Sequence, residues 1–462
     1  MPYKIYLFDT YSREKKEFIP LKPGKVAIYT CGPTVYDYPH IGNLRAYVFS
    51  DILRRVFKFN DYKVTQVVNI TDVGHLVSDA DEGEDKMEIK AREQNRSALE
   101  IADFYTRIFK ENLSNLNIEF PEIWSKATEH IPDQIDLILR LEKLGYTYKA
   151  SDGIYFDTFK VASYGYLGRV DVGGIHPGTR VKLGEKRNPT DFALWKFSLK
   201  NEKRQMEWQS PWGVGFPGWH IECSAMAMKY LGDTIDIHTG GIDHIPIHHT
   251  NEIAQSEAAT GKKFVDYWLH VAFLTVDGGK MSKSLHNFIT IQDIMDKGYD
   301  PLAFRYLSLT SHYRAGLNFT WQSFLGANEA LSSIREKIVS FGNEKTDPDN
   351  SLIEEFKARI NNDLNTPQVL DLLWETLKSK LSSAVKRATL LEFDRVLGLR
   401  LGESEKYVLV DIPIKVDELT KQREVFRNEK KWQESDEVRK RINDLGYDVD
   451  DTLAGSVIKK KR

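Results

Sequence analysis

Hydrophobic and polar positions follow two different periods along the first seventy residues of the chain. Lys25–Cys31 is a short β-rich run, apolar residues recur at helical spacing over Leu44–Phe57, and Tyr62–Ile70 again has the composition of a strand. This order predicts a strand–helix–strand unit. The connection Gly32–Gly42 leads to the N-terminus of the predicted helix, where free backbone N–H groups favour phosphate.

The α/β pattern returns after a segment of different character. Residues 122–204 are irregular, with an aromatic and glycine-rich middle, and we interpret them as an insertion into a nucleotide-binding fold. After the insertion the sequence predicts a helix over Ile221–Leu231 closed by Gly232, a strand over Thr234–Thr239, and a helix over His248–Ala259 closed by Gly261.

Helical spacing dominates the rest of the chain. Asp300 followed by Pro301 marks the start of a helix through Ser308, and Trp321–Leu397 predicts a helical bundle. Residues 408–462 are rich in charge and end in a basic run, which is typical of a solvated tail but could also hold a polyanion.

Composition and charge narrow the class of protein. A chain of 462 residues, with 41% hydrophobic and 28% charged residues, suits a globular protein of several domains. The net charge of −3 argues against a protein that coats nucleic acid indiscriminately, although a local basic face is allowed. No apolar run reaches about 18 residues, and the N-terminus is charged, so we expect a cytoplasmic protein with no membrane partner.

Histidines gather in one short window. Five of the twelve lie between residues 220 and 249, where an even spread would place about one. Cys223 lies in the window, and Glu252 follows His248 by four residues, so both side chains share one helix face. Cys31 ends the first strand, where α/β sheets place ligands. These residues suit a zinc ion, but a buried histidine and two buried thiols explain them equally well.

Two further segments contain residues that are suited to binding phosphate. Lys280–Ser284 (KMSKS) follows a glycine pair and puts two ammonium groups on a predicted loop. His40–Asn43 (HIGN) opens the first predicted helix. Together the two segments resemble the ATP site of the class I aminoacyl-tRNA synthetases.

Longer strings make the resemblance specific to the cysteinyl-tRNA synthetases. The strings are CGPTVYDYPHIGN (Cys31–Asn43), NITD (Asn69–Asp72), DFALWK (Asp191–Lys196), SPWGVGFPGWHIECSAM (Ser210–Met226), DIHTGGIDH (Asp236–His244), HHTNEIAQSEA (His248–Ala258), KMSKS, NDLNTP (Asn362–Pro367) and a stretch over Lys430–Thr452. They extend over nearly the whole chain.

The resemblance implies a role for each candidate residue. One zinc ion per chain would bind Cys31, Cys223, His248 and Glu252. Cysteine would be bound by Thr71, Trp219 and His238. ATP, with Mg²⁺, would be bound by His40, Gly42, Asn43, Asp243, Lys280 and Lys283, of which His40 and Lys283 would be catalytic.

The implied reaction is the joining of L-cysteine to tRNA(Cys) by way of cysteinyl-adenylate. A zinc ion can bind the thiolate of cysteine, whereas serine offers a hydroxyl that ionises much less readily. Metal coordination would therefore discriminate between them without a hydrolytic editing domain. The substrates would be ATP, L-cysteine and tRNA(Cys), and we expect a monomer.

The resemblance also implies the fold: α/β, with a Rossmann-type class I synthetase catalytic domain that carries an insertion, then an α-helical bundle and a small C-terminal anticodon-binding domain. The expected units are residues 1–121 and 205–270 for the two halves of the catalytic domain, 122–204 for the insertion, 271–315 for a stem-contact segment with the KMSKS loop, 316–407 for the tRNA-binding bundle and 408–462 for the anticodon-binding domain.

Three departures from the family pattern stand out. Asn43 replaces the usual histidine, Phe216 stands where arginine is expected, and the C-terminal end lacks an aromatic residue that could stack on an anticodon base. Two other functions are considered: an ATP-dependent ligase that joins cysteine to an amino-sugar, and a nucleotide- or tRNA-binding paralogue without catalysis. The first would not need residues 408–462, and the second would not need intact His40 and Lys283.

Overall fold

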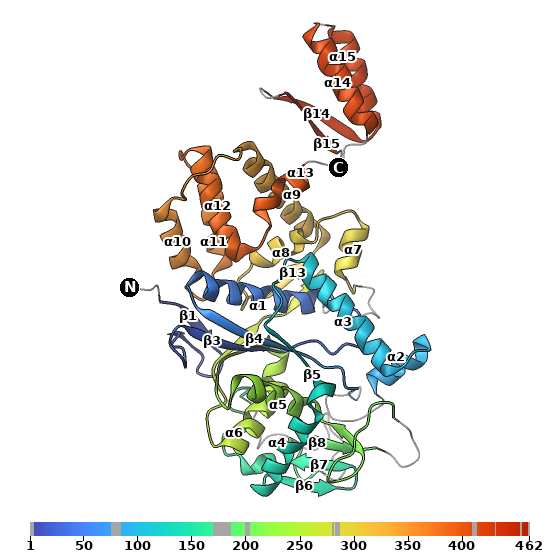
Figure 1. The fold of residues 1–462 in the computed structure, drawn as a ribbon, viewed down its shortest axis with the longest axis vertical. Helices are drawn as coiled ribbons and strands as arrows, with labels where there is room; N and C mark the ends of the chain where they lie inside the picture. Colours follow the sequence, from blue (N-terminus) through green and yellow to red (C-terminus); the bar gives the residue numbers. More distant parts are fainter. Residues whose placement is uncertain are drawn as a thin grey trace.

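A five-stranded parallel sheet lies at the centre of the molecule (Figure 1). The structure is a computed structural model that describes residues 4–74, 85–169, 186–198, 204–279, 281, 287–408, 414–429, 431–452 and 455–460. In spatial order the strands are β11 (Val265–Val271), β10 (Ile235–Gly241), β3 (Lys25–Thr30), β4 (Lys63–Ile70) and β5 (Ile123–Lys126). The predicted strand–helix–strand unit is confirmed.

The strand order creates a crevice at one edge of the sheet. β3 pairs in parallel with β4 on one side and with β10 on the other. The chain therefore passes from β3 to β4 in one direction across the sheet and from β10 to β11 in the other. Crossover connections diverge at this point, and open α/β sheets bind ligands there, outside the carboxyl ends of the strands. Cys31 follows β3 directly and therefore faces the crevice.

Helices cover both faces of the sheet. One face packs against α1 (Ile41–Phe59) and α3 (Ala98–Asn115), with α2 (Lys86–Gln94) before α3. The other face packs against α4 (Ile131–Lys143), α5 (Trp219–Leu231) and α6 (Thr250–Thr260). Gly232 and Gly261 end the last two helices with positive φ, 101° and 69°, as glycine permits at no steric cost. The expected helices after the insertion are confirmed with small shifts.

The insertion is more regular than its sequence indicates. An antiparallel sheet is formed by β6 (Thr147–Ala150), β7 (Gly153–Phe156), β8 (Phe192–Phe197) and β9 (Gly215–Pro217), and β9 lies beyond residue 204, the expected end of the insertion. The expected boundary at residue 122 needs correction, because β5 pairs with β4 and so belongs to the central sheet. A strand of four residues is too short for a periodic signal.

The C-terminal half is helical and divides into two packing units. The helices are α7 (Ile291–Asp296), α8 (Leu302–Leu309), α9 (Trp321–Ser340), α10 (Asn350–Ile360), α11 (Thr366–Lys378), α12 (Ser383–Leu397), α13 (Ser404–Val408), α14 (Ile414–Asn428) and α15 (Trp432–Asp444). One continuous core joins α8–α12 to α1 and the sheet. By contrast, α14 and α15 share a small core of their own with β14 (Tyr447–Thr452), which pairs with β15 (Gly455–Lys460).

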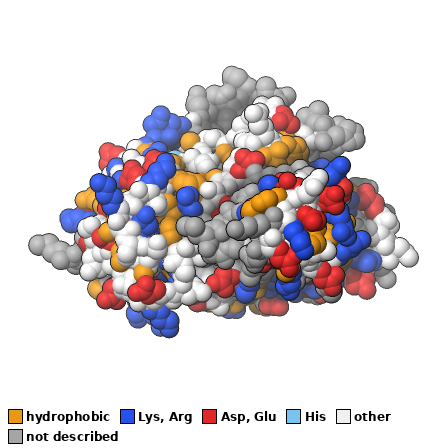
Figure 2. All heavy atoms as spheres, turned by 90° about the horizontal axis from the view of Figure 1, so that it is seen from above, with side chains coloured by type: hydrophobic (Ala, Val, Ile, Leu, Met, Phe, Trp, Pro, Cys, Tyr) orange, Lys and Arg blue, Asp and Glu red, His pale blue; other side chains and the backbone are white. Residues whose placement is uncertain are grey.

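Smaller elements complete the described fold. Two short pairs of strands are β1 (Tyr6–Asp9) with β2 (Glu14–Glu17), and β12 (Leu274–Val276) with β13 (Leu317–Phe319). Short helical turns cover Ala127–His130, Thr158–Lys160, Ile242–His244, Ile245–His249 and Leu401–Glu403. Within the described ranges, no helix combines the length and the apolar character that crossing a membrane requires. Figure 2 shows Lys and Arg side chains interspersed with Asp and Glu on the face seen from above, in keeping with the small net charge.

A buried arginine joins the catalytic unit to the bundle. Arg305 of α8 has no exposed surface, and its Nη2 donates to Asp51 Oδ2 of α1 at 2.6 Å. Its Nε donates to the carbonyl of Leu397 at the end of α12, and its Nη1 donates to the carbonyl of Leu116 after α3. One guanidinium therefore ties together four helices.

The junction leaves no room for another side chain. Gly398 has φ +66°, and a Cβ there would lie 2.6 Å from Nη2 of Arg305. A second buried arginine, Arg55, donates to Asp51 Oδ2 at 2.7 Å. Burial alone would raise the pKa of Asp51, but Arg305 and Arg55 outweigh it and hold that pKa below its ordinary value.

We expect Asp51→Asn to lower the free energy of unfolding of this unit by about 3 to 5 kcal/mol, because buried Arg305 loses its paired carboxylate and buried Arg55 keeps only the more distant Glu119. Urea titration measures the loss. Since the folded pKa of Asp51 is depressed, its contribution is complete above about pH 4 and disappears as the pH falls through the folded value.

The control is Glu392→Gln, which breaks an exposed ion pair with Arg395 and should leave the urea midpoint within error. Equal, small losses from both substitutions would contradict the role of the junction.

Candidate active site

Four buried side chains converge at the crevice. They are Cys31 after β3, Cys223 on α5, His248 in the turn before α6, and Glu252 in the first turn of α6. One ligand atom from each lies within 4.8 Å of every other. None is more than 8% exposed. The structure thus assembles the predicted ligand set from four separate segments.

The geometry between His248 and Glu252 fits a shared ion. Nε2 of His248 lies 3.0 Å from Oε1 of Glu252, yet this carboxylate oxygen makes no hydrogen bond to any described residue. Two polar atoms that approach closely without hydrogen-bond geometry are oriented toward a common point. An orphaned carboxylate oxygen is costly in the interior, and a cation at that point would remove the cost.

Further histidines hold the ligands in place. Nδ1 of His220 lies 2.9 Å from Nδ1 of His248, and Nε2 of His238 lies 2.9 Å from Oε2 of Glu252. Metal-binding histidines and carboxylates are commonly oriented by such partners. The ring of His238 also stacks on Trp268, with centroids 4.6 Å apart.

A chain of histidines extends from the first thiol. Nε2 of His249 lies 3.2 Å from Sγ of Cys31, and Nδ1 of His249 lies 2.7 Å from Nε2 of His270. Nδ1 of His270 in turn lies 2.8 Å from Oγ1 of Thr10. Because Cys31, His238, His249 and Glu252 also place ligand atoms within 4.8 Å of one another, Cys31 and Glu252 belong to two overlapping donor sets.

Burial and mutual contact shift the proton affinities of the cluster. Hydrogen bonding from Cys31 and His248 lowers the pKa of Cys223 to about 6, whereas burial raises the pKa of Cys31 well above its ordinary value. Burial opposes the charged form of His248, but Glu252 and Cys223 raise its pKa to about 10. The cluster therefore gathers two anionic groups, Cys223 and Glu252, and the proton on His248 would have to leave for its imidazole to bind a divalent ion.

The first signature folds into a helix cap. His40 is the N-cap of α1: its Nδ1 accepts from the backbone N–H of Asn43 at 3.2 Å, and the Asn43 side chain accepts from the backbone N–H of His40. Burial lowers the pKa of His40, so the ring is neutral near pH 7. With Nδ1 as acceptor, Nε2 carries the proton. Asn43 therefore acts by capping the helix, a role that needs no charge on its side chain.

The second signature lies beside the first. A Cβ on Gly42 would come within 2.5 Å of Cε of Met281, so the absence of a side chain permits this contact. The backbone N–H of Ile41 also donates to the carbonyl of Ile289 at 2.9 Å. Lys280 and Lys283 lie outside the described residues, and their expected roles stay predictions.

The expected cysteine-binding residues occupy different depths of the crevice. Thr71 is buried at the end of β4, where its N–H donates to the carbonyl of Pro33. Trp219 is half-buried, and its ring lies 4.3 Å from that of His248. His238 is fully buried, and its Nε2 contacts Glu252, so it holds this member of the ligand set in place.

Asp243 lies farther out on the same edge. It occupies the short turn after β10, its side chain is 59% exposed, and its charge acts on His40. Its place is compatible with the expected contact to ATP.

The departure at Phe216 has a structural counterpart. The guanidinium of Arg204 lies 3.6 Å from the centroid of the buried Phe216 ring. Arg204 also pairs with Asp85 and donates to the carbonyl of Gly74. A guanidinium from another segment is therefore in contact with the position where the family pattern has arginine.

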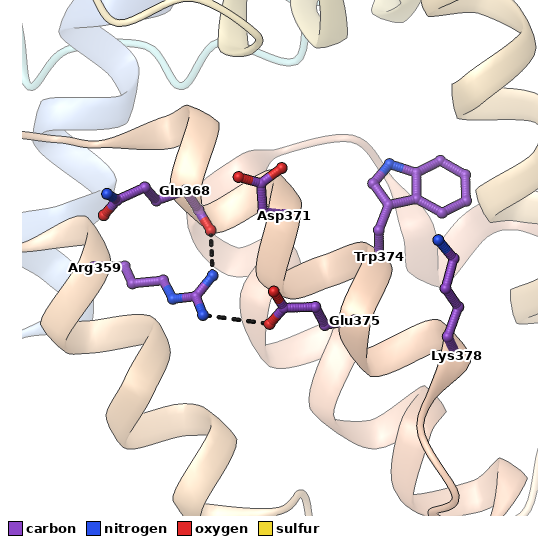
Figure 3. Close-up of a pocket in the computed structure, with 6 residues that line it drawn as sticks. All are labelled: Arg359, Gln368, Asp371, Trp374, Glu375 and Lys378. Atoms are coloured by element: carbon purple, nitrogen blue, oxygen red, sulfur yellow. Dashed lines mark hydrogen bonds and ion pairs between the residues drawn. The ribbon is translucent and has the colours of Figure 1, made fainter.

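A separate hollow of about 570 Å³ lies on the bundle, far in sequence from these residues (Figure 3). Its lining comes from α10 and α11 and comprises Arg359, Gln368, Asp371, Trp374, Glu375 and Lys378. Figure 3 shows Arg359 joined to the carbonyl of Gln368 and to Glu375. The lining has two acidic and two basic side chains, so it presents no field of one sign.

Sequence reasoning missed several residues of the site. His270 and Trp268 lie on β11, outside the histidine window, and Tyr29 lies beside the cluster on β3. The apolar run around His270 could have indicated a strand, but such a run does not place His270 near the cluster without the sheet order.

Solved structures agree with the described fold. Methionyl-tRNA synthetase of Mycobacterium tuberculosis, in complex with methionyl-adenylate, has a TM-score of 0.55 at 14% identity, over 86% of this chain and 94% of that chain. A ternary complex of LeuRS with tRNA and LeuAMS from Agrobacterium radiobacter has a TM-score of 0.55 at 12% identity, over 84% and 85%. These likenesses confirm the expected fold class.

Sequence comparisons show the family as well as the fold. A family model described as "tRNA synthetases class I (C) catalytic domain" matches residues 17–329. "Cysteine--tRNA ligase 1" of Burkholderia lata is 50% identical over 457 residues, which cover 98% of this chain and 96% of that protein. "Cysteine--tRNA ligase" of Treponema denticola is 42% identical over 489 residues, which cover 99% of each. The chain therefore belongs to the cysteine–tRNA ligase family of class I aminoacyl-tRNA synthetases.

Proposed function

We propose that this cysteine–tRNA ligase selects its amino acid with a zinc ion held by Cys31, Cys223, His248 and Glu252. The observation that carries the proposal is the convergence of these four buried side chains, each with a ligand atom within 4.8 Å of the others. When bound, the ion would supply a soft partner for the thiolate of substrate cysteine, which the hydroxyl of serine does not match. Among the described residues the two donor sets share Cys31 and Glu252, so the proposal is one ion per chain.

The chain's own residues prepare the pocket for cysteine. The hydrogen bond between His220 and His248 fixes the orientation of the imidazole, and His238 does the same for Glu252. The ring of Trp219 lies over His248 and gives the pocket an apolar wall. Thr71, at the neighbouring strand end, offers a hydroxyl toward the amino acid.

The N-terminus of α1 serves the phosphates. When the carboxylate of cysteine attacks the α-phosphorus of ATP, negative charge develops on the phosphate oxygens as pyrophosphate leaves. Nε2–H of His40 and the backbone N–H of Gly42 are donors held in place before the reaction, whereas the N–H groups of Ile41 and Asn43 already have partners. Lys280 and Lys283 would serve the pyrophosphate side, with Mg²⁺, and Asp243 would contact ATP.

Residues 408–462 would bind the anticodon end of tRNA(Cys). Their described part has a core separate from the catalytic unit, and exposed Arg439, Lys440 and Arg441 stand together on α15. Arg423, another basic residue of this segment, is 1% exposed and therefore has a structural role. Phosphate contacts by the exposed cations would add affinity without touching the crevice.

The two alternative functions have less support. An amino-sugar ligase would not need residues 408–462, whereas the relatives named cysteine–tRNA ligase match almost the full chain. An inactive paralogue would not need the intact ligand set or the His40 cap. The monomeric state and the cytoplasmic location stay predictions.

Cys223→Ser should reduce bound zinc and raise the KM for cysteine at least tenfold while changing the KM for ATP little, because the ion would contact the amino acid alone. Elemental analysis and cysteine-dependent pyrophosphate exchange are the measurements. The control is His130→Gln, which alters a buried histidine bonded to Lys126 and Tyr230, outside the crevice. A wild-type protein purified without zinc would refute the proposal.

Asn43→Ala should lower the rate of pyrophosphate exchange about tenfold or more, since His40 loses the partner that fixes its tautomer and position. The matched control is Ser323→Ala, which removes the equivalent capping residue of α9 and should cost similar stability, about 1 kcal/mol, with no loss of exchange. If both variants lose exchange in proportion to stability, Asn43 has no role beyond capping.

A chain that ends at Val408 should keep cysteine-dependent pyrophosphate exchange while charging of tRNA falls at least tenfold, because the acceptor end visits the adenylate less often. Val408 is the appropriate end, since Tyr407 lies against Arg335 and Glu405 accepts from Asn343, so both complete the bundle. Circular dichroism tests folding, and unchanged charging by the folded protein would exclude the anticodon role.

A further inference from the structure

A surface of aromatic and basic side chains borders the crevice on the side of α3. It comprises Tyr38, Arg96, Phe104 and Arg107, and we call it the α3 patch. Tyr38 belongs to the first signature, two residues before His40, and is 45% exposed. Its ring lies edge-on to those of Phe104 and Tyr105. The patch is therefore connected directly to the ATP end of the site.

Two guanidiniums share the Phe104 ring. Arg96 lies 5.0 Å and Arg107 lies 5.9 Å from its centroid, and both arginines are exposed. Within the described ranges, neither guanidinium has a carboxylate oxygen within 4 Å. The neighbouring acids have other direct partners: Glu93 pairs with Lys90, Asp103 pairs with Lys126, and Glu100 caps α3, although the charge of Arg96 also acts on Glu100. The patch therefore presents two positive charges that the protein does not neutralise by direct ion pairs.

The topology fixes which edge of the sheet the patch borders. α3 is the crossover from β4 to β5, so its first turns lie at the carboxyl ends of the strands and its last turn at their amino ends (Figure 1). The ion pair between Asp103 and Lys126, the last residue of β5, confirms this placement at 3.0 Å. Arg96, Phe104 and Arg107 thus border the same edge as Cys31 and His40.

We propose that the α3 patch binds the unpaired 3′ nucleotides of tRNA on their way to the adenylate. The proposal rests on the site proposed above, because it requires the reaction to occur at this edge. Unpaired bases stack on exposed aromatic rings and on guanidinium planes, and their phosphates attract the same guanidiniums. A base-paired stem would offer the patch its backbone alone, so the exposed Tyr38 ring favours a single strand.

The test compares Arg96→Gln/Arg107→Gln with Lys25→Gln/Lys63→Gln. The control pair lies at the amino ends of β3 and β4, on the opposite edge of the sheet, and removes the same charge. The probes are a full tRNA(Cys) transcript and one that lacks the unpaired 3′ nucleotides. Binding is measured over a range of salt concentrations, and pyrophosphate exchange without tRNA reports whether the crevice is intact.

The patch variant should bind the full transcript about tenfold more weakly than the wild type and bind the shortened transcript equally well. For the patch variant, the slope of log affinity against log salt concentration should become less steep by about 1.4, which is roughly 0.7 for each lost single-strand phosphate contact. Arg96→Lys/Arg107→Lys should keep the salt dependence but recover the affinity partly, because ammonium groups do not stack. The control pair and the exchange rates should be unchanged.

Equal loss of affinity for both transcripts would overturn the proposal in favour of a stem contact, and unchanged binding would overturn it outright. A change in molecular mass of the variant would instead assign the patch to contact with a second copy of the chain. If the wild-type protein shows no cysteine-dependent pyrophosphate exchange, the result refutes the proposed function and not the proposal for the α3 patch.

Discussion

Glu252 lies fully buried in the first turn of α6, with His238 and His248 against its two carboxylate oxygens. A charged carboxylate removed from water is unfavourable by several kcal/mol unless opposite charge and hydrogen bonds surround it. The helix N-terminus offsets part of this, and the two histidines offset more. Accordingly, Glu252 has a pKa well below its ordinary value despite its burial. β3, β10 and α5 pack close to α6. Their packing brings the other metal-donor side chains of the cluster to Glu252 and excludes water around them.

The same constraint explains why the crevice is built in layers. Three of the four side chains of the cluster have a partner behind them: His220 behind His248, His238 behind Glu252, and His249, itself held by His270, behind Cys31. Burial lowers the pKa of His249 and His270 well below the ordinary value, so these rings stay neutral and act as hydrogen-bonding supports. The phosphate side uses a different device, a neutral His40 held by its own helix cap. In the proposed function, the amino acid and ATP would bind at these two groups, which lie at one edge of the sheet.

The packing around that edge continues into the bundle, whereas the described part of the C-terminal unit has a core of its own. Arg305 and Asp51 connect α8 and α12 to α1, whose first turn carries the ATP signature. The C-terminal helices and strands share a core of six buried side chains, separate from this network. A tRNA that contacts both units would therefore bridge a rigid catalytic body and a second unit with its own packing. The α3 patch would guide the end that reaches the crevice.

The strand–helix–strand unit and the helices closed by Gly232 and Gly261 could be predicted from the sequence, as could the four side chains that the structure brings together, because hydrophobic period, glycine caps and long motifs are local properties of the chain. The sequence also identified the family. Packing decided three other features: β5 lies in the central sheet, His270 lies behind His249, and Arg96 and Arg107 lie against Phe104, whose ring contacts Tyr38. These features depend on which segments become neighbours, and strand order and burial establish that through the packing of distant residues rather than through any local pattern.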